Sequence, residues 1–200
     1  MQAGKKRTTQ LKERMIAEGL RMLLEHGYNG LGVQAVLDAT GSPKGSFYHH
    51  FRSKEDFALA VVDAYIANVH ALLEECVNDH TRPPLDRIRL FFETVEQSYR
   101  EEGYLGCLMG GLGQELSGVS DVFRRKIDWC FSSIAERLTV ALEDARKSGI
   151  IRGDSDSRHL ANLLVDCWEG AALRSRLKRS PASLQAMLEF FFSSVTSSGY

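Results

Sequence analysis

Residues 32–57 read GVQAVLDATGSPKGSFYHHFRSKEDF, and this stretch decides the fold of the N-terminal part of the chain. Its apolar spacing predicts a short helix over 33–40, which Gly41 ends because glycine tolerates the left-handed backbone that follows a helix. Ser42 and Pro43 then match the N-cap and the first position of a second short helix. Two short helices joined by a turn that contains glycine form a helix-turn-helix.

Longer amphipathic helices are predicted on both sides of this helix-turn-helix. Upstream, apolar side chains recur at helical spacing over 11–24, and Gly27 is expected to end that helix. Downstream, Ser53 followed three residues later by Asp56 resembles the capping box that opens a helix. Apolar residues then mark one face of this fourth helix as far as Cys76, and we expect it to connect two domains.

The rest of the chain keeps the helical spacing of apolar residues, and no stretch of four to eight residues alternates as a half-buried strand would. The sequence therefore predicts an all-α fold of about nine helices. Pro83 and Pro84 suit the first turn of a helix but not its interior, which places a boundary near residue 80. The later helices are expected over 85–102, 105–116, 120–148, 157–178 and 181–197.

Composition and charge narrow the class of protein. The apolar share of 44% predicts a buried core of ordinary size. Residues 1–54 hold nine Lys and Arg against four Asp and Glu, and the remainder holds sixteen against twenty-two. A basic N-terminal excess of this size is typical of nucleic-acid-binding segments and equally of solvated helix faces. No signal peptide or membrane span is expected, which predicts a soluble, cytoplasmic protein.

The cysteines lack metal-ligand spacing, so neither a metal site nor a disulfide framework is predicted; they are Cys76, Cys107, Cys130 and Cys167.

The third helix is too short to supply much core, and its composition favours contact with something outside the protein. If Phe47 and Phe51, four residues apart, face inward against the first helix, the remaining side chains face outward. The residues left on that outer face are Lys44, Gly45, Ser46, Tyr48 and His49.

These outward residues suit the major groove of DNA. Lys44 can donate to phosphate or to guanine acceptors, Ser46 can reach either, and Tyr48 and His49 offer donors for phosphate oxygens. Lys54 lies in the first turn of the fourth helix, where a cation is poorly matched to the positive helix end unless an anion is near. We interpret Lys54 as a contact to the DNA backbone.

The run TGSPKGSFYHHFRSKEDF, residues 40–57, closely resembles the DNA-binding signature of TetR-type transcription regulators. The resemblance implies that residues 1–52 form a DNA-binding domain, that 53–80 form a connecting helix, and that 81–200 form an effector-binding and dimerisation domain. It also implies three kinds of partner: operator double-stranded DNA, a small-molecule effector, and a second copy of the chain that pairs through the last two helices. One departure is Gly32, where the family often places a threonine cap, but glycine is an acceptable N-cap.

The segment YLGCLMGGLGQEL, residues 104–116, is unusual because five glycines fall between Gly103 and Gly113, and each interior glycine costs a helix about 1 kcal/mol relative to alanine. Either tight packing or a deformable helix beside a pocket explains them, or the segment is a loop. Cys107 is expected at the start of this helix, where the positive helix end favours a thiolate.

The triplet Gly106, Cys107 and Leu108, followed by Glu115 and Leu116, resembles the branch of TetR-type regulators that responds to reactive electrophiles or oxidants through this cysteine. The alternative is a buried structural cysteine beside a pocket that binds its ligand without a covalent bond. Aromatic side chains that are candidates to line such a pocket, or else plain core, are Phe92, Tyr104, Trp129 and Trp168.

No motif indicates catalysis or a cofactor: the glycines of GGLG follow no strand and precede no Lys-Ser pair, as a phosphate-binding loop requires. The predicted function is therefore a regulator, most simply a repressor, that releases its operator when the C-terminal domain senses a small molecule or electrophile. The alternative is a helical dimeric adaptor or ligand-binding protein that does not bind operator DNA. Lys44, Ser46, Tyr48 and Lys54 argue against it.

Overall fold

The computed structural model describes residues 2–152 and 154–196, with side chains from residue 9 onward. Within these residues the chain forms nine α-helices, and one isolated antiparallel bridge joins Ile151 to Thr196. The predicted all-α class and number of helices are confirmed. The helices are α1 (Gln2–Gly30), α2 (Val33–Thr40), α3 (Lys44–His50), α4 (Lys54–Val77), α5 (Pro84–Glu101), α6 (Leu108–Leu116), α7 (Asp121–Lys147), α8 (Ser157–Lys178) and α9 (Ala182–Val195).

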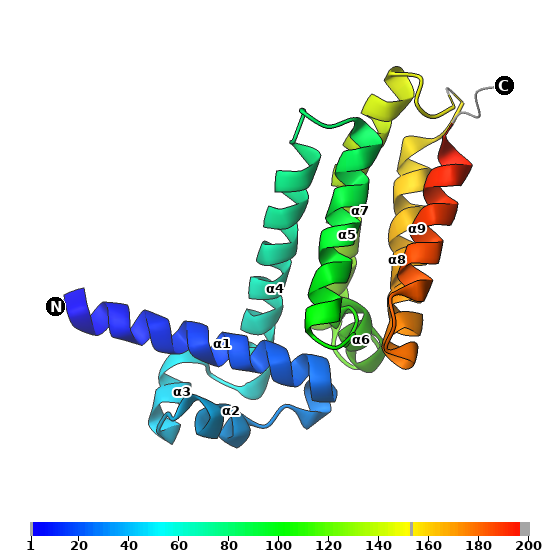
Figure 1. Ribbon diagram of the computed structural model, residues 1–200. Helices are drawn as coiled ribbons and strands as arrows, with labels where there is room; N and C mark the ends of the chain where they lie inside the picture. The colour runs from blue at the N-terminus through cyan, green and yellow to red at the C-terminus, as the bar shows by residue number, and fades with distance from the viewer. Residues whose placement is uncertain (1, 153, 197–200) are drawn as a thin grey trace.

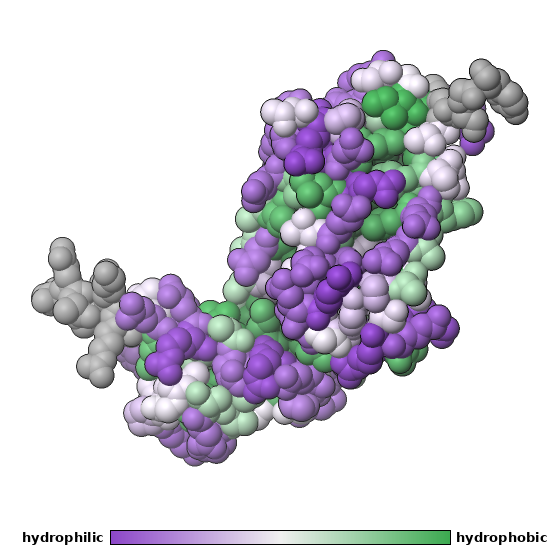
Figure 2. Space-filling model, viewed as in Figure 1, coloured by the Kyte–Doolittle hydropathy of each residue, from purple (hydrophilic) through white to green (hydrophobic). Residues whose placement is uncertain are grey.

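The molecule has two lobes (Figure 1). α1 lies across α2 and α3 in the smaller lobe, and α4 rises from it into a bundle that α5, α7, α8 and α9 complete. α6 lies at the end of the bundle nearest α1 and contacts it. In the view of Figure 2, hydrophilic residues cover most of the smaller lobe, whereas apolar residues show at several places over the bundle.

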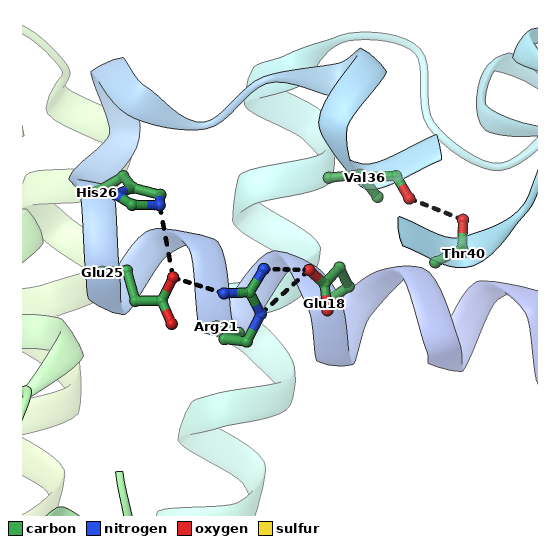
Figure 3. Close-up of polar contacts among 6 residues, drawn as sticks. All are labelled: Glu18, Arg21, Glu25, His26, Val36 and Thr40. Carbon is green, nitrogen blue, oxygen red and sulfur yellow. Dashed lines mark hydrogen bonds and ion pairs between the residues drawn. The ribbon is translucent and has the colours of Figure 1, made fainter. Parts of the chain in front are cut away.

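The surface of α1 and the end of α2 are fixed by local polar contacts (Figure 3). Arg21 donates to Glu18 and to Glu25 on either side of it along α1, with nitrogen–oxygen distances of 2.5 Å to each. Such exposed pairs stabilise a helix by only a few tenths of a kcal/mol each. At the end of α2 the buried hydroxyl of Thr40 donates to the carbonyl oxygen of Val36 at 2.8 Å, so its burial leaves no unpaired polar group.

Two of the predicted helix boundaries in the smaller lobe are wrong by a few residues. α1 continues to Gly30, but Gly27 has a φ of 69° and a ψ of −177°, so the helical path breaks where the sequence predicted its end. α3 begins at Lys44 with Pro43 as its N-cap. Ser42 does not cap it, because the Ser42 hydroxyl bonds with Thr40 instead.

Boundaries also shift in the bundle. α6 starts at Leu108 rather than at 105, because Gly103 and Gly106 adopt φ values of 70° and 81° that belong to a turn. α9 starts at Ala182 and ends at Val195; residue 197, the last in the predicted range, lies outside the described residues.

α4 connects the two lobes. Among the described helices it alone is long and apolar enough to cross a membrane by length and composition, yet it packs against α1, α5 and α7. Three polar contacts hold it to α7: Asp63 with Lys126, His70 with Ser133, and Glu74 with Arg137. The partners are 63 residues apart in every case, so the two helices run parallel in one register. We call these contacts the α4–α7 ladder.

Candidate functional sites

The first candidate site is the outer face of α3, which is held from beneath by aromatic rings. Phe47 is fully buried and Phe51 nearly so, as the sequence predicted. The ring centroid of Phe57, at the start of α4, lies 5.2 Å from that of Phe47 and 4.8 Å from that of Phe51, in the edge-to-face geometry that aromatic pairs favour. This aromatic cluster fixes the orientation of α3 relative to α4.

The side chains around this cluster point outward. Lys44, Tyr48 and His49 are exposed, and 56% of Tyr48 is accessible to solvent. Ser46 is half-buried and donates to the carbonyl oxygen of Pro43 within its own turn. Gly45 is also exposed, and a Cβ atom added there would meet no protein atom within 4 Å. The packing of the fold therefore does not require a glycine at this position.

Lys54 opens α4 beside this surface and already has contacts within the protein. Its Nζ atom lies 3.4 Å from the carbonyl oxygen of Asn29 and 4.7 Å from the ring centroid of Tyr28. The side chain is half-buried. A phosphate contact from Lys54 therefore needs a partner close to the junction of α1 and α4.

The second candidate site is a cavity of about 780 Å³ between the C-terminal end of α1, α6 and α8, to which Phe131 of α7 also contributes. A second, apolar cavity of about 40 Å³ lies among α4, α5, α7 and α8. Cys107 and Glu169 line both cavities, so they stand where an outer chamber meets an inner one. The volume of the outer cavity suits a small organic molecule.

Two of the four predicted aromatic lining residues reach these cavities. Phe92 and Trp168 line the inner one, with ring centroids 4.7 Å apart. The prediction is wrong for Tyr104 and Trp129, which line neither cavity. Tyr104 turns away to donate to Glu96 at 3.3 Å, and Trp129 is 56% exposed on the outer side of α7.

Cys107 is the N-cap of α6, close to its predicted position. Its thiol hydrogen-bonds with the backbone N–H groups of Gly110 and Met109, which lower its pKa, but burial and the neighbouring Glu169 carboxyl raise the pKa well above its ordinary value. The helix start does favour a thiolate, as expected, but desolvation of the sulfur outweighs it, so the resting protein holds Cys107 as a thiol.

Glu169 is the charged group of this site. It comes from the buried side of α8, and burial raises the pKa of its carboxyl to about 7, while its hydrogen bond with Cys107 acts in the opposite direction. The hydroxyl of Tyr65 lies 3.9 Å from the Cys107 sulfur on another side. Gly110 allows this approach: a Cβ atom there would lie 2.3 Å from the Glu169 Oε2 atom.

The far end of α6 contacts the smaller lobe through Glu115. One of its carboxylate oxygens accepts from the N–H of Tyr28 at 2.7 Å, and the other accepts from the N–H of Asn29 at 2.8 Å. Gly27 makes room for this carboxylate, since a Cβ atom there would lie 2.6 Å from Glu115 Oε2. One short helix therefore carries Cys107 at its start and a contact with the smaller lobe at its end.

Sequence reasoning did not assign Glu169 or Tyr65 to the site. A signal for Glu169 was available, because it interrupts the buried face of α8 between Val165 and Ala172. A carboxyl at a buried helical position needs a reason, and functional sites supply it often.

Two family profiles match the chain. The profile described as "Bacterial regulatory proteins, tetR family" matches residues 15–61, which span the helix-turn-helix. The profile described as "Tetracyclin repressor-like, C-terminal domain" matches residues 84–191, which cover more than half of the chain.

Individual proteins are similar over nearly the whole chain. Transcriptional regulator AcuR of Cereibacter sphaeroides is 37% identical over 178 residues, covering 88% of this chain and 81% of that protein. The crystal structure of regulatory protein TetR from Rhodobacter sphaeroides superposes with a TM-score of 0.87 at 36% identity, over 92% of this chain and 98% of the other.

The HTH-type transcriptional repressor NemR of Escherichia coli is 30% identical over 178 residues, covering 88% of this chain and 89% of that protein. The crystal structure of its reduced form superposes with a TM-score of 0.84 at 28% identity, over 95% of this chain and 98% of the other.

Proposed function

Because the chain belongs to the tetR family of bacterial regulatory proteins, we propose that it is a repressor that reads operator DNA with α3 and releases it when an effector occupies the cavity beside α6. As a family member it is a DNA-binding transcription regulator and not an enzyme. Regulators of this family bind operator DNA and small-molecule effectors, and they act as dimers.

The observation that carries the DNA-binding part of the proposal is the outer face of α3. Lys44, Tyr48 and His49 are exposed on a helix that Phe47 and Phe51 hold in place. Lys44 supplies a base or phosphate contact, and Gly45 lets the backbone approach the groove. Ser46 and His49 add hydrogen bonds, and Lys54 adds a backbone contact where α4 begins.

We expect Lys44→Ala to weaken operator binding about tenfold, since one good base contact is worth about 1–3 kcal/mol. Loss of a phosphate contact instead would lower the steepness with which affinity falls with salt. Binding is measured by fluorescence anisotropy at several salt concentrations, with the promoter DNA beside the protein's own gene. Lys147→Ala, an exposed lysine at the far end of α7, is the matched control. Equal affinity of both variants and wild type would refute the assignment of α3.

The dimer proposal rests on the outward side of α8 and α9. These helices expose several large apolar side chains: Leu163, Leu173, Leu177 and Phe190, the last of which is 74% accessible in the single chain. Side chains of this kind gather where helices pair between protomers. A homodimer through the last two helices would cover them and hold two α3 helices over two half-sites, about 34–36 Å or a multiple of that apart.

For the effector, the position of Cys107 between the two cavities favours a sensing role. The outer cavity gives a molecule of modest size access to the sulfur, and α6 connects that point to Tyr28 and Asn29 through Glu115. An effector at Cys107 that displaces α6 would act on the smaller lobe directly. Such a response requires that the effector bind the two states with different affinity.

We expect N-ethylmaleimide to release wild-type protein from its operator and to leave Cys107→Ser bound. Cys167→Ser, which removes the exposed thiol of α8, is the control and should respond as wild type does. Operator occupancy before and after treatment is the measurement. If Cys107→Ser also releases DNA, the thiol is not the sensor, and the cavity then binds its effector without a covalent bond.

We propose that the two lobes have different functions. We assign residues 1–52 to DNA binding, 53–80 to the connection, and 81–200 to effector binding and dimerisation, in a protein that acts in the cytoplasm beside its DNA. An adaptor without operator binding is the competing function, and the operator experiment above decides between the two.

A further inference from the structure

Glu169 is half-buried on α8, and its carboxyl is largely shielded from solvent without a cationic partner among the described residues. It forms no ion pair there; Arg176, a basic residue that also lines the outer cavity, donates to the carbonyl oxygen of Leu24 at 3.2 Å. Burial and the interaction with Cys107 are what set the pKa of Glu169. A charge placed this way costs stability, since burial disfavours the ionised form.

The groups that face Glu169 come from four different elements. They are Cys107 at the start of α6, Tyr65 on α4, Tyr99 on α5 and Cys130 on α7, and burial raises the pKa of every one of them. For Cys130 the pKa reaches about 12. All four therefore hold their protons at neutral pH, and Glu169 is the one group in this cluster that can accept one.

From this arrangement we propose that Glu169 takes the proton of the Cys107 thiol when the sulfur adds to an α,β-unsaturated carbonyl compound in the outer cavity. The inference rests on the proposed sensing function and deepens it, because it names the residue that makes the thiol reactive. Glu169 positions and deprotonates the sulfur and does not itself bond to the effector.

The step balances without any other reactant. The sulfur of Cys107 forms a bond to the β-carbon, the carbon–carbon double bond opens, and its electron pair moves to the carbonyl as an enolate. The thiol proton passes to the Glu169 carboxylate and then to the α-carbon of the enolate. The product is a thioether, and Glu169 returns to its starting state, as a general base does.

The start of α6 supports the same step. The N–H groups of Met109 and Gly110 hydrogen-bond with the sulfur and favour its anionic form, as free N–H groups at a helix start do. The missing side chain of Gly110 is what admits the carboxylate, because a Cβ atom would lie 2.3 Å from its Oε2 atom. An alanine there would push the carboxylate away from the sulfur.

The test measures how fast N-ethylmaleimide modifies Cys107 between pH 5.5 and 9. The full-length protein carries Cys167→Ser to remove the exposed thiol, and mass spectrometry of the peptide that contains Cys107 gives the rate. The parent should react slowly below pH 7 and faster above it, with an inflection near the pKa of Glu169. Glu169→Gln should lose that inflection and react about a hundredfold more slowly at pH 7.5, at the lower edge of the usual range for a general base.

Two further variants make the result decisive. Glu136→Gln makes the same chemical change at an exposed glutamate of α7 and should match the parent. Gly110→Ala keeps the carboxyl but displaces it, and should slow the reaction as Glu169→Gln does. Thermal melting establishes that each variant is folded; should Glu169→Gln not fold, Gly110→Ala decides.

The proposal would be overturned if Glu169→Gln reacted with the same inflection and rate as the parent. If Glu169→Gln does not fold, the same result in Gly110→Ala would overturn it. So would a Cys107 that stays unmodified at every pH. Operator binding of the unmodified proteins is measured in parallel. A failure of the proposed regulator function appears there as absence of DNA binding, whatever the modification rates show, so the two failures are distinguishable.

Discussion

Phe47→Ala is expected to lower the free energy of unfolding by about 3–5 kcal/mol, the usual cost of deleting a buried phenylalanine ring, and to abolish operator binding at the same time. Phe47 is fully buried and its ring contacts those of Phe51 and Phe57. α3 has only seven residues and is too short to be stable without this packing. Urea denaturation and operator binding on one preparation measure both effects.

The neighbouring residue provides the control for that prediction. Tyr48 is exposed, so Tyr48→Ala should change the free energy of unfolding by less than about 1 kcal/mol and still weaken DNA binding. A loss of stability below about 1 kcal/mol in Phe47→Ala would contradict the view that this ring holds α3 in place.

The second large effect is expected at Glu115. Its carboxylate accepts two backbone N–H groups at the end of α1, at 2.7 and 2.8 Å, and a hydrogen bond to a charged group contributes about 1.5–3 kcal/mol. Because the contact is half-exposed, we expect Glu115→Ala to cost about 2–4 kcal/mol in total. Chemical denaturation measures this cost.

Glu115→Ala should also weaken the response to effector, since it removes the contact by which α6 holds Tyr28 and Asn29. The readout is the ratio of operator affinities with and without N-ethylmaleimide. Glu136→Ala, the same chemical change at an exposed position of α7, is the control. An unchanged ratio in Glu115→Ala would mean that the lobes communicate through another contact, such as the bond between Arg176 and Leu24.

The helices could be predicted from sequence because their signals are local. The bounds of α2 and α8 match the predicted ranges 33–40 and 157–178, since Gly41 ends the first and Asp156 caps the second. The start of α6 was misplaced because glycine permits both helix and turn. Only the tertiary structure decides that Gly106 turns while Gly110 is helical.

The candidate sites divide in the same way. The inward side of α3 followed from the spacing of Phe47 and Phe51, because a helix of seven residues has few alternatives. The direction in which Tyr104 and Trp129 point did not follow from sequence. Tyr104 lies in a turn with a φ of 59° and bonds back to Glu96, and Trp129 stands on the exposed side of α7. The raised pKa of Cys107 could not be predicted either, because it depends on burial by distant helices and on Glu169, which is 62 residues away along the chain.

The α4–α7 ladder has a consequence for how the two lobes can move. Each of its three contacts is partly exposed and adds little to the free energy of folding. All three, however, share one spacing, so sliding α4 along α7 by a single helical turn of about 5.4 Å would break them together. A rotation of α4 that keeps this register leaves the three pairs opposite one another. In a dimer, the distance between the two α3 helices would then change through a change in the angle of α4, while the helical bundle stays in place.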